Sequence, residues 1–186
     1  MKKGLKHFNP DKVAQLDLNM WQAYYSHNFF RLFILLLQLN HEFFGLNYLA
    51  TLRAAYYSAT AAIDFKLHRG RENSERIIKN LSKFLKIVSN KSLEKFDYKK
   101  AAELELAWWL IDRYPNKYET SREVALAAAM AAVYGVQTSA LTDYANYRAQ
   151  AMVLNDKAEA AGHETDWSQV GILLKKSFNS LHQSVQ

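Results

Sequence analysis

The chain has 186 residues, of which 49% are hydrophobic and 13% aromatic, with six Gly, two Pro and no Cys. This length and composition predict one globular domain with a bulky core, and they exclude a disulfide-stapled, collagen-like or disordered chain. No apolar run is long enough for a transmembrane helix, and no secretory signal pattern follows Met1. Because Cys is missing as well, we expect a soluble cytoplasmic protein.

The formal net charge of +6 is unevenly placed along the chain. Residues 66–100 contain 11 Lys or Arg and 4 Asp or Glu, which gives this segment a net charge of +7. The rest of the chain has 13 basic and 14 acidic residues. The whole excess of positive charge therefore lies in one segment.

The segment from Asn9 to His68 is predicted to form two long helices joined by a short bend at Gly45-Leu46-Asn47. Asn9 is a suitable helix cap, and Pro10 suits the first helical position, where its missing N–H is not needed. Both helices are apolar nearly all round, so we expect them at the centre of the fold.

Apolar residues at helical spacing, together with cap residues, predict about five further helices. The first follows a break at Arg69-Gly70-Arg71 and is capped by Asn73 or Ser74, and the second begins at the cap Asp97 and ends at Tyr114. The third begins at a capping box, Thr120–Glu123, and stops at Gly135. The fourth covers residues 139–161, and the fifth begins at the cap Asp166. The predicted fold class is therefore all-α, a single irregular bundle of about seven helices around two long central ones. One domain spans residues 1–186, with 1–8 expected as a flexible N-terminal tail.

Charged residues lie on helix faces that the periodicity predicts to be buried. Lys is missing between Val13 and Phe65, so the inward cations there are all Arg, the residue suited to buried ion pairs and to bidentate binding of carboxylate or phosphate. A buried carboxylate such as Glu105, which lies near two tryptophans, must be paired, hydrogen-bonded or protonated. The predicted inward set is Asp17, Arg31, Glu42, Arg53, Asp64, Glu105, Asp112 and Arg148, with Tyr24, Tyr57, Tyr144 and Tyr147 near them.

Two interpretations of this inward set stay open. In the first, Arg and Asp or Glu pair across the bundle and hold the helices in register. In the second, part of the set lines a pocket for a small anionic or polar ligand, with Arg31, Arg53 and Arg148 holding the anionic group. The leading hypothesis is then a non-enzymatic helical binding or adaptor protein. Its predicted ligand-binding residues are Arg31, Glu42, Arg53, Tyr57, Glu105, Trp109, Tyr144 and Arg148.

Enzyme motifs are missing from the sequence: it has no HExxH, GxSxG, P-loop, GxGxxG or Glu-x-x-His. We therefore predict no metal and no cofactor. The alternative is a ferritin-like or haem-oxygenase-like helical metalloenzyme, with Glu42 and Glu105 as metal ligands or acid–base groups.

A second alternative is contact of the basic segment 66–100 with nucleic acid or an acidic surface. The lysines that would make this contact are Lys79, Lys83, Lys86, Lys95, Lys99 and Lys100. A lysine-rich helix face is usually only solvated, and no aromatic residues are interleaved in the pattern of an RNA motif, so we do not expect a nucleic-acid partner. Phe and Leu around the second half of the first predicted helix make a homodimer a further prediction.

Four stretches carry a resemblance to a known family: residues 19–57, AELELAWWLIDR at 102–113, NYRAQAMVLND at 146–156 and DWSQVGILLKKSFNSL at 166–181. The chain from Val13 to Leu181 resembles an uncharacterised family of bacterial all-helical proteins. The resemblance implies a bacterial, cytosolic, all-helical protein. Because the family carries no assigned activity, it implies no catalytic residue.

Overall fold

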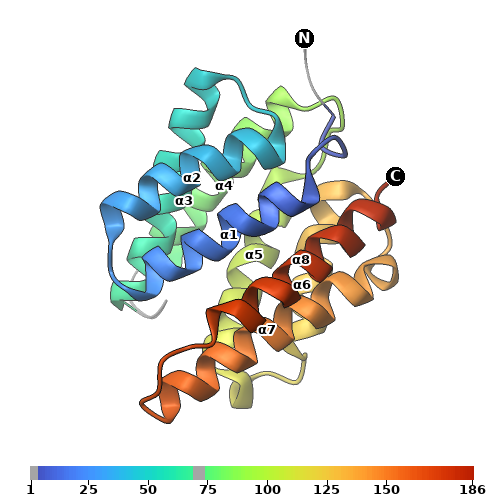
Figure 1. Ribbon diagram of the computed structural model, residues 1–186. Coiled ribbons are helices and arrows are strands. Elements are labelled where there is room, and N and C mark those ends of the chain that lie inside the picture. Colours follow the sequence, from blue (N-terminus) through green and yellow to red (C-terminus); the bar gives the residue numbers. More distant parts are fainter. Residues whose placement is uncertain (1–3, 69–73) are drawn as a thin grey trace.

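A computed structural model describes residues 4–68 and 74–186 (Figure 1). The described residues form eight α-helices and two short 3-10 helices and contain no strand, so the all-α prediction is confirmed. The predicted boundary at Arg69-Gly70-Arg71 and the cap Asn73 lie outside the described residues. The helices are α1 (Pro10–Tyr25), α2 (Phe29–Phe44), α3 (Tyr48–His68), α4 (Ser74–Lys91), α5 (Tyr98–Arg113), η1 (Pro115–Lys117), α6 (Arg122–Tyr134), η2 (Thr138–Leu141), α7 (Thr142–Ala160) and α8 (Trp167–Ser184).

The first long helix of the prediction is in fact two helices, α1 and α2, separated at residues 26–28. The backbone of His27 is left-handed, with φ of 58°, and the N–H of Asn28 donates to the carbonyl of Ala23 over 2.9 Å. This is the Schellman ending of a helix, which usually places Gly where His27 stands. The side chain of Asn28 then accepts from the backbone N–H of Arg31 and caps α2. The prediction of one continuous helix is therefore wrong.

Side-chain caps explain where most of the other helices begin. Asn9, Asp97 and Asp166 accept hydrogen bonds from the first turns of α1, α5 and α8, as the sequence predicted. At α6 the cap is Ser121, which accepts from the N–H of Val124, and not the predicted Thr120. These caps compensate for N–H groups that have no partner inside their own helix.

The eight helices form a closed ring. Each helix packs against its neighbours in the sequence, and α8 returns to pack against α1, so the ring closes between the two ends of the chain. In Figure 1 the blue helix α1 and the red helix α8 lie side by side, and both termini lie at the same end of the molecule. No single helix is central, in contrast to the prediction for residues 46–68. Leu52 and Tyr56 of α3 are exposed because α3 is a member of the ring.

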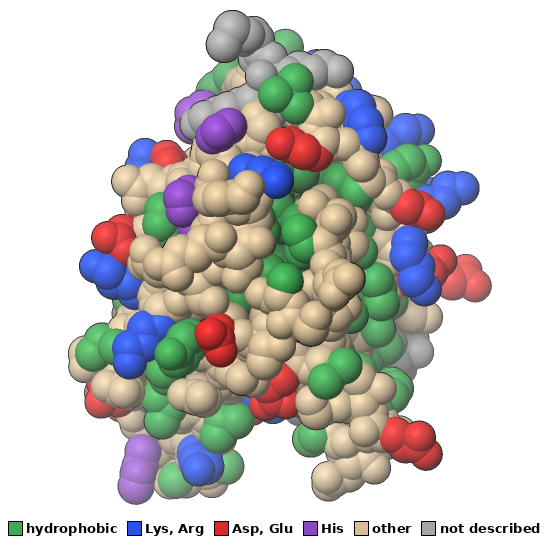
Figure 2. Space-filling model, turned by 90° about the vertical axis from the view of Figure 1, so that its right-hand side faces the viewer, with side chains coloured by type: hydrophobic (Ala, Val, Ile, Leu, Met, Phe, Trp, Pro, Cys, Tyr) green, Lys and Arg blue, Asp and Glu red, His purple; other side chains and the backbone are tan. Residues whose placement is uncertain are grey.

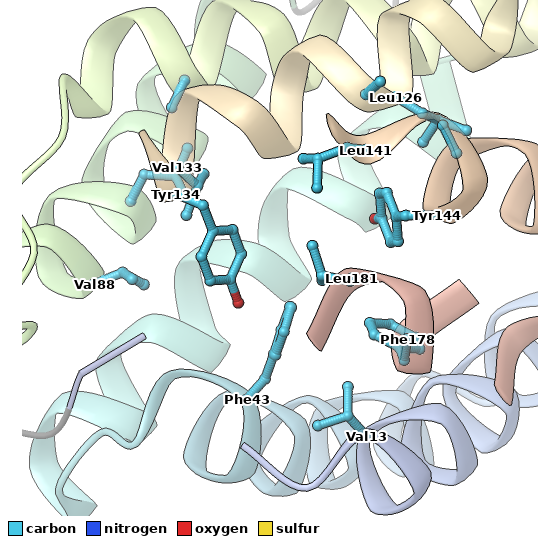
Figure 3. Close-up of a cluster of buried hydrophobic side chains, with 14 of the residues drawn as sticks. Val13, Phe43, Val88, Leu126, Val133, Tyr134, Leu141, Tyr144, Phe178 and Leu181 are labelled. Atoms are coloured by element: carbon cyan, nitrogen blue, oxygen red, sulfur yellow. The ribbon is translucent and has the colours of Figure 1, made fainter. Parts of the chain in front are cut away.

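The helices enclose a large hydrophobic cluster, part of which Figure 3 shows. In it, Phe43 of α2 and Phe178 of α8 meet edge to face with ring centroids 5.6 Å apart. The hydroxyl of Tyr134 from α6 donates to the carbonyl of Leu5 over 3.3 Å.

Residues 4–8 are part of this core, so the predicted flexible tail is wrong for them. Leu5 is fully buried and Phe8 is nearly so. The N–H of Leu5 donates to Oε2 of Glu94 over 2.8 Å, which fixes the segment against the loop after α4. Residues 1–3 lie outside the described residues.

The surface carries charges of both signs. On the face that Figure 2 presents, Lys, Arg, Asp and Glu side chains are interspersed around apolar patches. Within the described ranges, no single helix has the length and apolar composition of a membrane span, whereas Arg122–Tyr134 and Thr138–Ala160, bent by 112°, pass that test as a pair.

The left-handed residue between α1 and α2 leads to a stability prediction. His27→Gly should raise the free energy of unfolding by about 0.5–1 kcal/mol, because a residue with a Cβ is strained at this φ and Gly is not. Thermal or urea unfolding followed by circular dichroism measures the change. Ser26→Gly is the matched control, since Ser26 has φ of −79° and should lose stability instead. Equal losses for both variants would contradict the assignment of the break.

Candidate functional site

The ring of helices encloses a central cavity of about 270 Å³. All eight α-helices contribute side chains to its wall, which is mostly aromatic and aliphatic and includes Trp21, Trp108 and Trp109. Short side chains on α3 and α6, at Ala62 and Ala129, leave space where the helices face the centre. The cavity follows from the closed ring, because opposite helices are too far apart for these side chains to fill the middle.

A buried ion pair crosses the interior between α1 and α7. Nη1 of Arg148 donates to Oδ2 of Asp17 over 2.5 Å, and Nη2 lies 3.5 Å from Oδ1, so the contact is bidentate. The exposed fractions of the two side chains are 11% for Arg148 and 3% for Asp17. The guanidinium also lies 5.3 Å from the ring centre of Trp21 and 5.5 Å from that of Phe178. These contacts hold the cation at one wall of the cavity with its charge compensated.

Glu105 of α5 lies beside this ion pair. Its Oε1 accepts a hydrogen bond from Nε1 of Trp109 over 3.0 Å, one helical turn further on. Burial raises the pKa of the Glu105 carboxyl, and the indole donors and Arg148 only partly oppose this rise. The side chain is surrounded by protein, yet the residue keeps some accessible surface, as expected for a group that lines a cavity. Burial thus favours the neutral acid over the carboxylate.

Tyr144 of α7 is the fourth polar side chain of this region, and it is 2% exposed. Among the described residues its hydroxyl makes no hydrogen bond, although the ring lines the cavity. Burial raises the pKa of the Tyr144 phenol to about 12, so the group keeps its proton. The position of the residue is fixed by Ser177, whose hydroxyl donates to the backbone carbonyl of Tyr144 over 2.8 Å.

The cavity reaches the surface where α1 and α5 end. Of the described residues that line it, Arg113 alone is exposed. Next to it, Nζ of Lys66 donates to the carbonyl of Tyr24 over 2.6 Å and lies 4.1 Å from the centre of the Tyr24 ring. Burial raises the pKa of the Tyr24 phenol to about 12, against the opposing effect of Arg113. Arg113, Lys66 and Tyr24 therefore surround the mouth of the cavity.

A second ion-pair network joins α5, α6 and α7 close to this mouth. Nε of Arg122 lies 2.7 Å from Oδ1 of Asp112, and its Nη2 donates to Oδ2 of Asp156 over 2.9 Å. Burial raises the pKa of the Asp112 carboxyl, while Arg122 opposes that rise. From the sequence, Arg122 was identified only as part of the capping box that begins a helix. No helical spacing relates it to Asp112 or Asp156, because these two residues are on other helices.

The structure brings together half of the predicted ligand-binding residues. Glu105, Trp109, Tyr144 and Arg148 all line the cavity.

The other four predicted residues lie elsewhere. Arg31 and Arg53 are exposed, so the prediction that they face inward is wrong. Glu42 pairs with Lys12 over 2.5 Å at the surface end of α1. Tyr57 lies under the ammonium of Lys83, which is 5.0 Å from its ring centre. The face predicted for the first helix does not carry over to α2, because the turn at residues 26–28 reorients the chain.

The remaining predicted inward carboxylates have partners. Asp64 is buried and lies 2.9 Å from Nε of Arg76, and Asp17 and Asp112 pair as described. Asp17 was predicted to face inward but was not included among the ligand-binding residues. Its partner on α7 is 131 positions away, which no spacing rule could indicate.

Two surface features concern the alternative hypotheses. A groove between α4 and α5 is lined by Lys79, Lys83, Lys86, Tyr98 and Lys99, so the basic segment presents a cationic surface. Contact with nucleic acid or an acidic surface through it stays a prediction.

Exposed apolar side chains lie on α2 and α3. They are Phe30, Ile34, Leu49, Leu52 and Tyr56. The homodimer stays a prediction, and this face is where it would form.

The metalloenzyme alternative needs carboxylates or histidines that converge. In residues 4–68 and 74–186, no group of three or more His, Asp or Glu is placed to hold a metal ion. Glu105 lines the cavity, whereas Glu42 does not.

In comparisons with known proteins, no family model matches the chain, and no curated protein or solved structure does so either. The resemblance to bacterial helical proteins therefore stays a prediction.

The Asp17–Arg148 pair gives a prediction about stability. Asp17→Leu and Arg148→Met should each lower the free energy of unfolding by about 3–5 kcal/mol, because each leaves an uncompensated buried charge. The double variant should lose much less than the sum of the two single losses. Chemical denaturation measures all three values. Lys175→Met, which breaks an exposed pair with Asp11, is the control and should change little. If the double variant loses as much unfolding free energy as the two single variants together, Asp17 and Arg148 are not paired.

Glu105 gives a prediction about pH. The folded protein holds the Glu105 proton more tightly than the unfolded chain, so this residue makes stability fall as pH rises from 4.5 toward its raised pKa. Glu105→Gln removes this loss and should gain stability relative to the wild type as pH rises above 4.5. Each unit of raised pKa corresponds to about 1.4 kcal/mol. Melting curves at several pH values measure the difference, with Glu103→Gln on the exposed side of α5 as control. A pH-independent difference would contradict the burial of this carboxyl.

Proposed function

We propose that this protein binds a small, mostly apolar molecule in its central cavity and acts as a binding protein. The observation that carries the proposal is the cavity itself, a space of about 270 Å³ in the middle of the ring with mostly aromatic and aliphatic walls and a minority of polar groups. Ligand sites in proteins have this character, since apolar walls provide affinity and a few polar groups fix orientation.

The size of the cavity limits the ligand. An apolar cavity of about 150 Å³ is large enough for benzene. The cavity here is nearly twice that volume, which suits two fused rings with a small substituent. The mouth near Arg113 gives such a molecule a route from solvent.

Naphthalene is a suitable first probe, because three of the four tryptophans line the cavity and report its occupation by a change in fluorescence. Ala129→Leu should weaken naphthalene binding at least tenfold, since three additional carbon atoms enter the cavity from α6. The fold should be retained or stabilised, because the new side chain fills empty space. Tryptophan fluorescence titration and calorimetry measure the affinity.

Ala128→Leu is the matched control, because Ala128 is on the same helix and does not line the cavity. It should leave naphthalene binding unchanged. Equal binding by Ala129→Leu and the wild type would reject the cavity as the binding site. Native mass spectrometry of the purified protein, compared with the denatured mass, tests in parallel for a ligand carried from the cell.

A further inference from the structure

We propose that the ligand of the central cavity is a neutral carbonyl compound and that the hydroxyl of Tyr144 donates a hydrogen bond to its oxygen. This inference rests on the proposed function and specifies the chemical class of the ligand. The class includes aromatic or aliphatic ketones, aldehydes and esters with a mostly apolar body.

The first step is Tyr144, a residue that is 2% exposed and whose hydroxyl makes no hydrogen bond with the described residues. A buried polar group without a partner is destabilising and is rare in native proteins. Tyr144 lines the cavity, and its backbone carbonyl is already held by Ser177. The hydroxyl is therefore positioned before a ligand arrives, and the cavity is where its partner would lie.

Tyr134 is a second buried tyrosine, and its hydroxyl does have a hydrogen-bond partner. Both phenols are buried in the same core cluster (Figure 3). The hydroxyl of Tyr134 donates to the carbonyl of Leu5, so this residue has the kind of acceptor that Tyr144 lacks. Tyr134 does not line the cavity, and Tyr144 does.

The second step is the balance of donors and acceptors around Tyr144. Arg148 has five N–H donors and Trp109 has one, whereas the acceptors nearby are the carboxyl groups of Asp17 and Glu105, which these same donors already contact. A ligand oxygen that accepts a hydrogen bond complements such a surplus of donors. A ligand that brought a hydrogen-bond donor instead could use the hydroxyl of Tyr144 only as an acceptor, and the surplus of protein donors would remain.

The third step is charge. The cation of Arg148 is compensated by Asp17, and burial keeps Glu105 toward its neutral form. A neutral ligand adds no further charge beside this compensated pair. An anion would place an uncompensated charge in an apolar enclosure, which is strongly unfavourable. The expectation of an anionic ligand rested on Arg31 and Arg53 as well, and both lie at the surface.

Four probes that share one ring system separate these chemistries: naphthalene, 2-acetylnaphthalene, naphthalene-2-carboxylate and 2-naphthylmethylammonium. Each is titrated into the wild type, Tyr144→Phe and Tyr134→Phe. In the wild type the ketone should bind more tightly than the carboxylate and the ammonium. The ratio of ketone affinity to naphthalene affinity should fall about three- to tenfold in Tyr144→Phe, the usual contribution of one neutral hydrogen bond. Naphthalene affinity itself should not change in either variant.

Stability measurements on the two variants serve as the control. Tyr144→Phe removes a hydroxyl without a partner and should melt at the wild-type temperature or above it. Tyr134→Phe loses its bond to Leu5 and should melt lower, with an unchanged affinity ratio. A loss of stability in Tyr144→Phe as large as that in Tyr134→Phe would reveal a protein partner for this hydroxyl and overturn the inference.

The binding outcomes separate the two proposals. If naphthalene binds to none of the proteins, the proposed function fails and the inference fails with it. If naphthalene binds but the affinity ratio is the same in Tyr144→Phe, only the inference is overturned. Tighter binding of the carboxylate or the ammonium than of the ketone also overturns it, because the cavity would then select a charged ligand.

Discussion

The ion pair of Asp17 with Arg148 is the interaction on which the interior of this protein depends. It joins α1 to α7 across the inside of the ring, next to α8, which packs against both of these helices. Removing two charges from water is expensive, and only bidentate geometry and the flanking rings of Trp21 and Phe178 make the pair tolerable. A pair of this kind resists rearrangement, because moving either helix would leave a buried charge without its partner. It therefore sets the register of α1 against α7 and α8.

The cavity is the other consequence of the ring. A bundle of four helices can fill its centre with side chains, but eight helices in a closed ring enclose more space than alanine-lined segments of α3 and α6 can occupy. Large side chains such as Leu5 and Tyr134 fill part of the core outside the cavity. The middle is not filled, and there charged and hydroxyl groups from several helices lie among aromatic and aliphatic side chains. The ring of helices therefore provides both the packed core of the protein and the central cavity.

The sequence predicted the part of the site that is local to one helix. Glu105 and Trp109 are one turn apart on α5, and Tyr144 and Arg148 are one turn apart on α7, so each pair shares a face that periodicity can identify. Arg31 was assigned to the site because one helix was expected to run through residues 26–28, and Arg53 because the second predicted helix was expected to be buried on all sides. The left-handed backbone of His27 ends the first of these helices, and no Gly announces it. Arg122 was overlooked because its partners Asp112 and Asp156 are on two other helices.

By itself the sequence determined the all-helical class, most helix boundaries and the inward faces of α5 and α7, because caps and periodicity are properties of neighbouring residues. It also determined that several charges must be buried and must find partners. Which charges meet was decided only by the tertiary structure, since Asp17 and Arg148 are brought together by closure of the ring. The break at His27, the cavity and the missing partner of the Tyr144 hydroxyl were decided there as well. The cavity and the Tyr144 hydroxyl depend on how segments far apart in the chain share one interior volume, and the periodicity of a single helix carries no information about that. The break at His27 is local, but it uses a residue other than the Gly that usually marks such an ending.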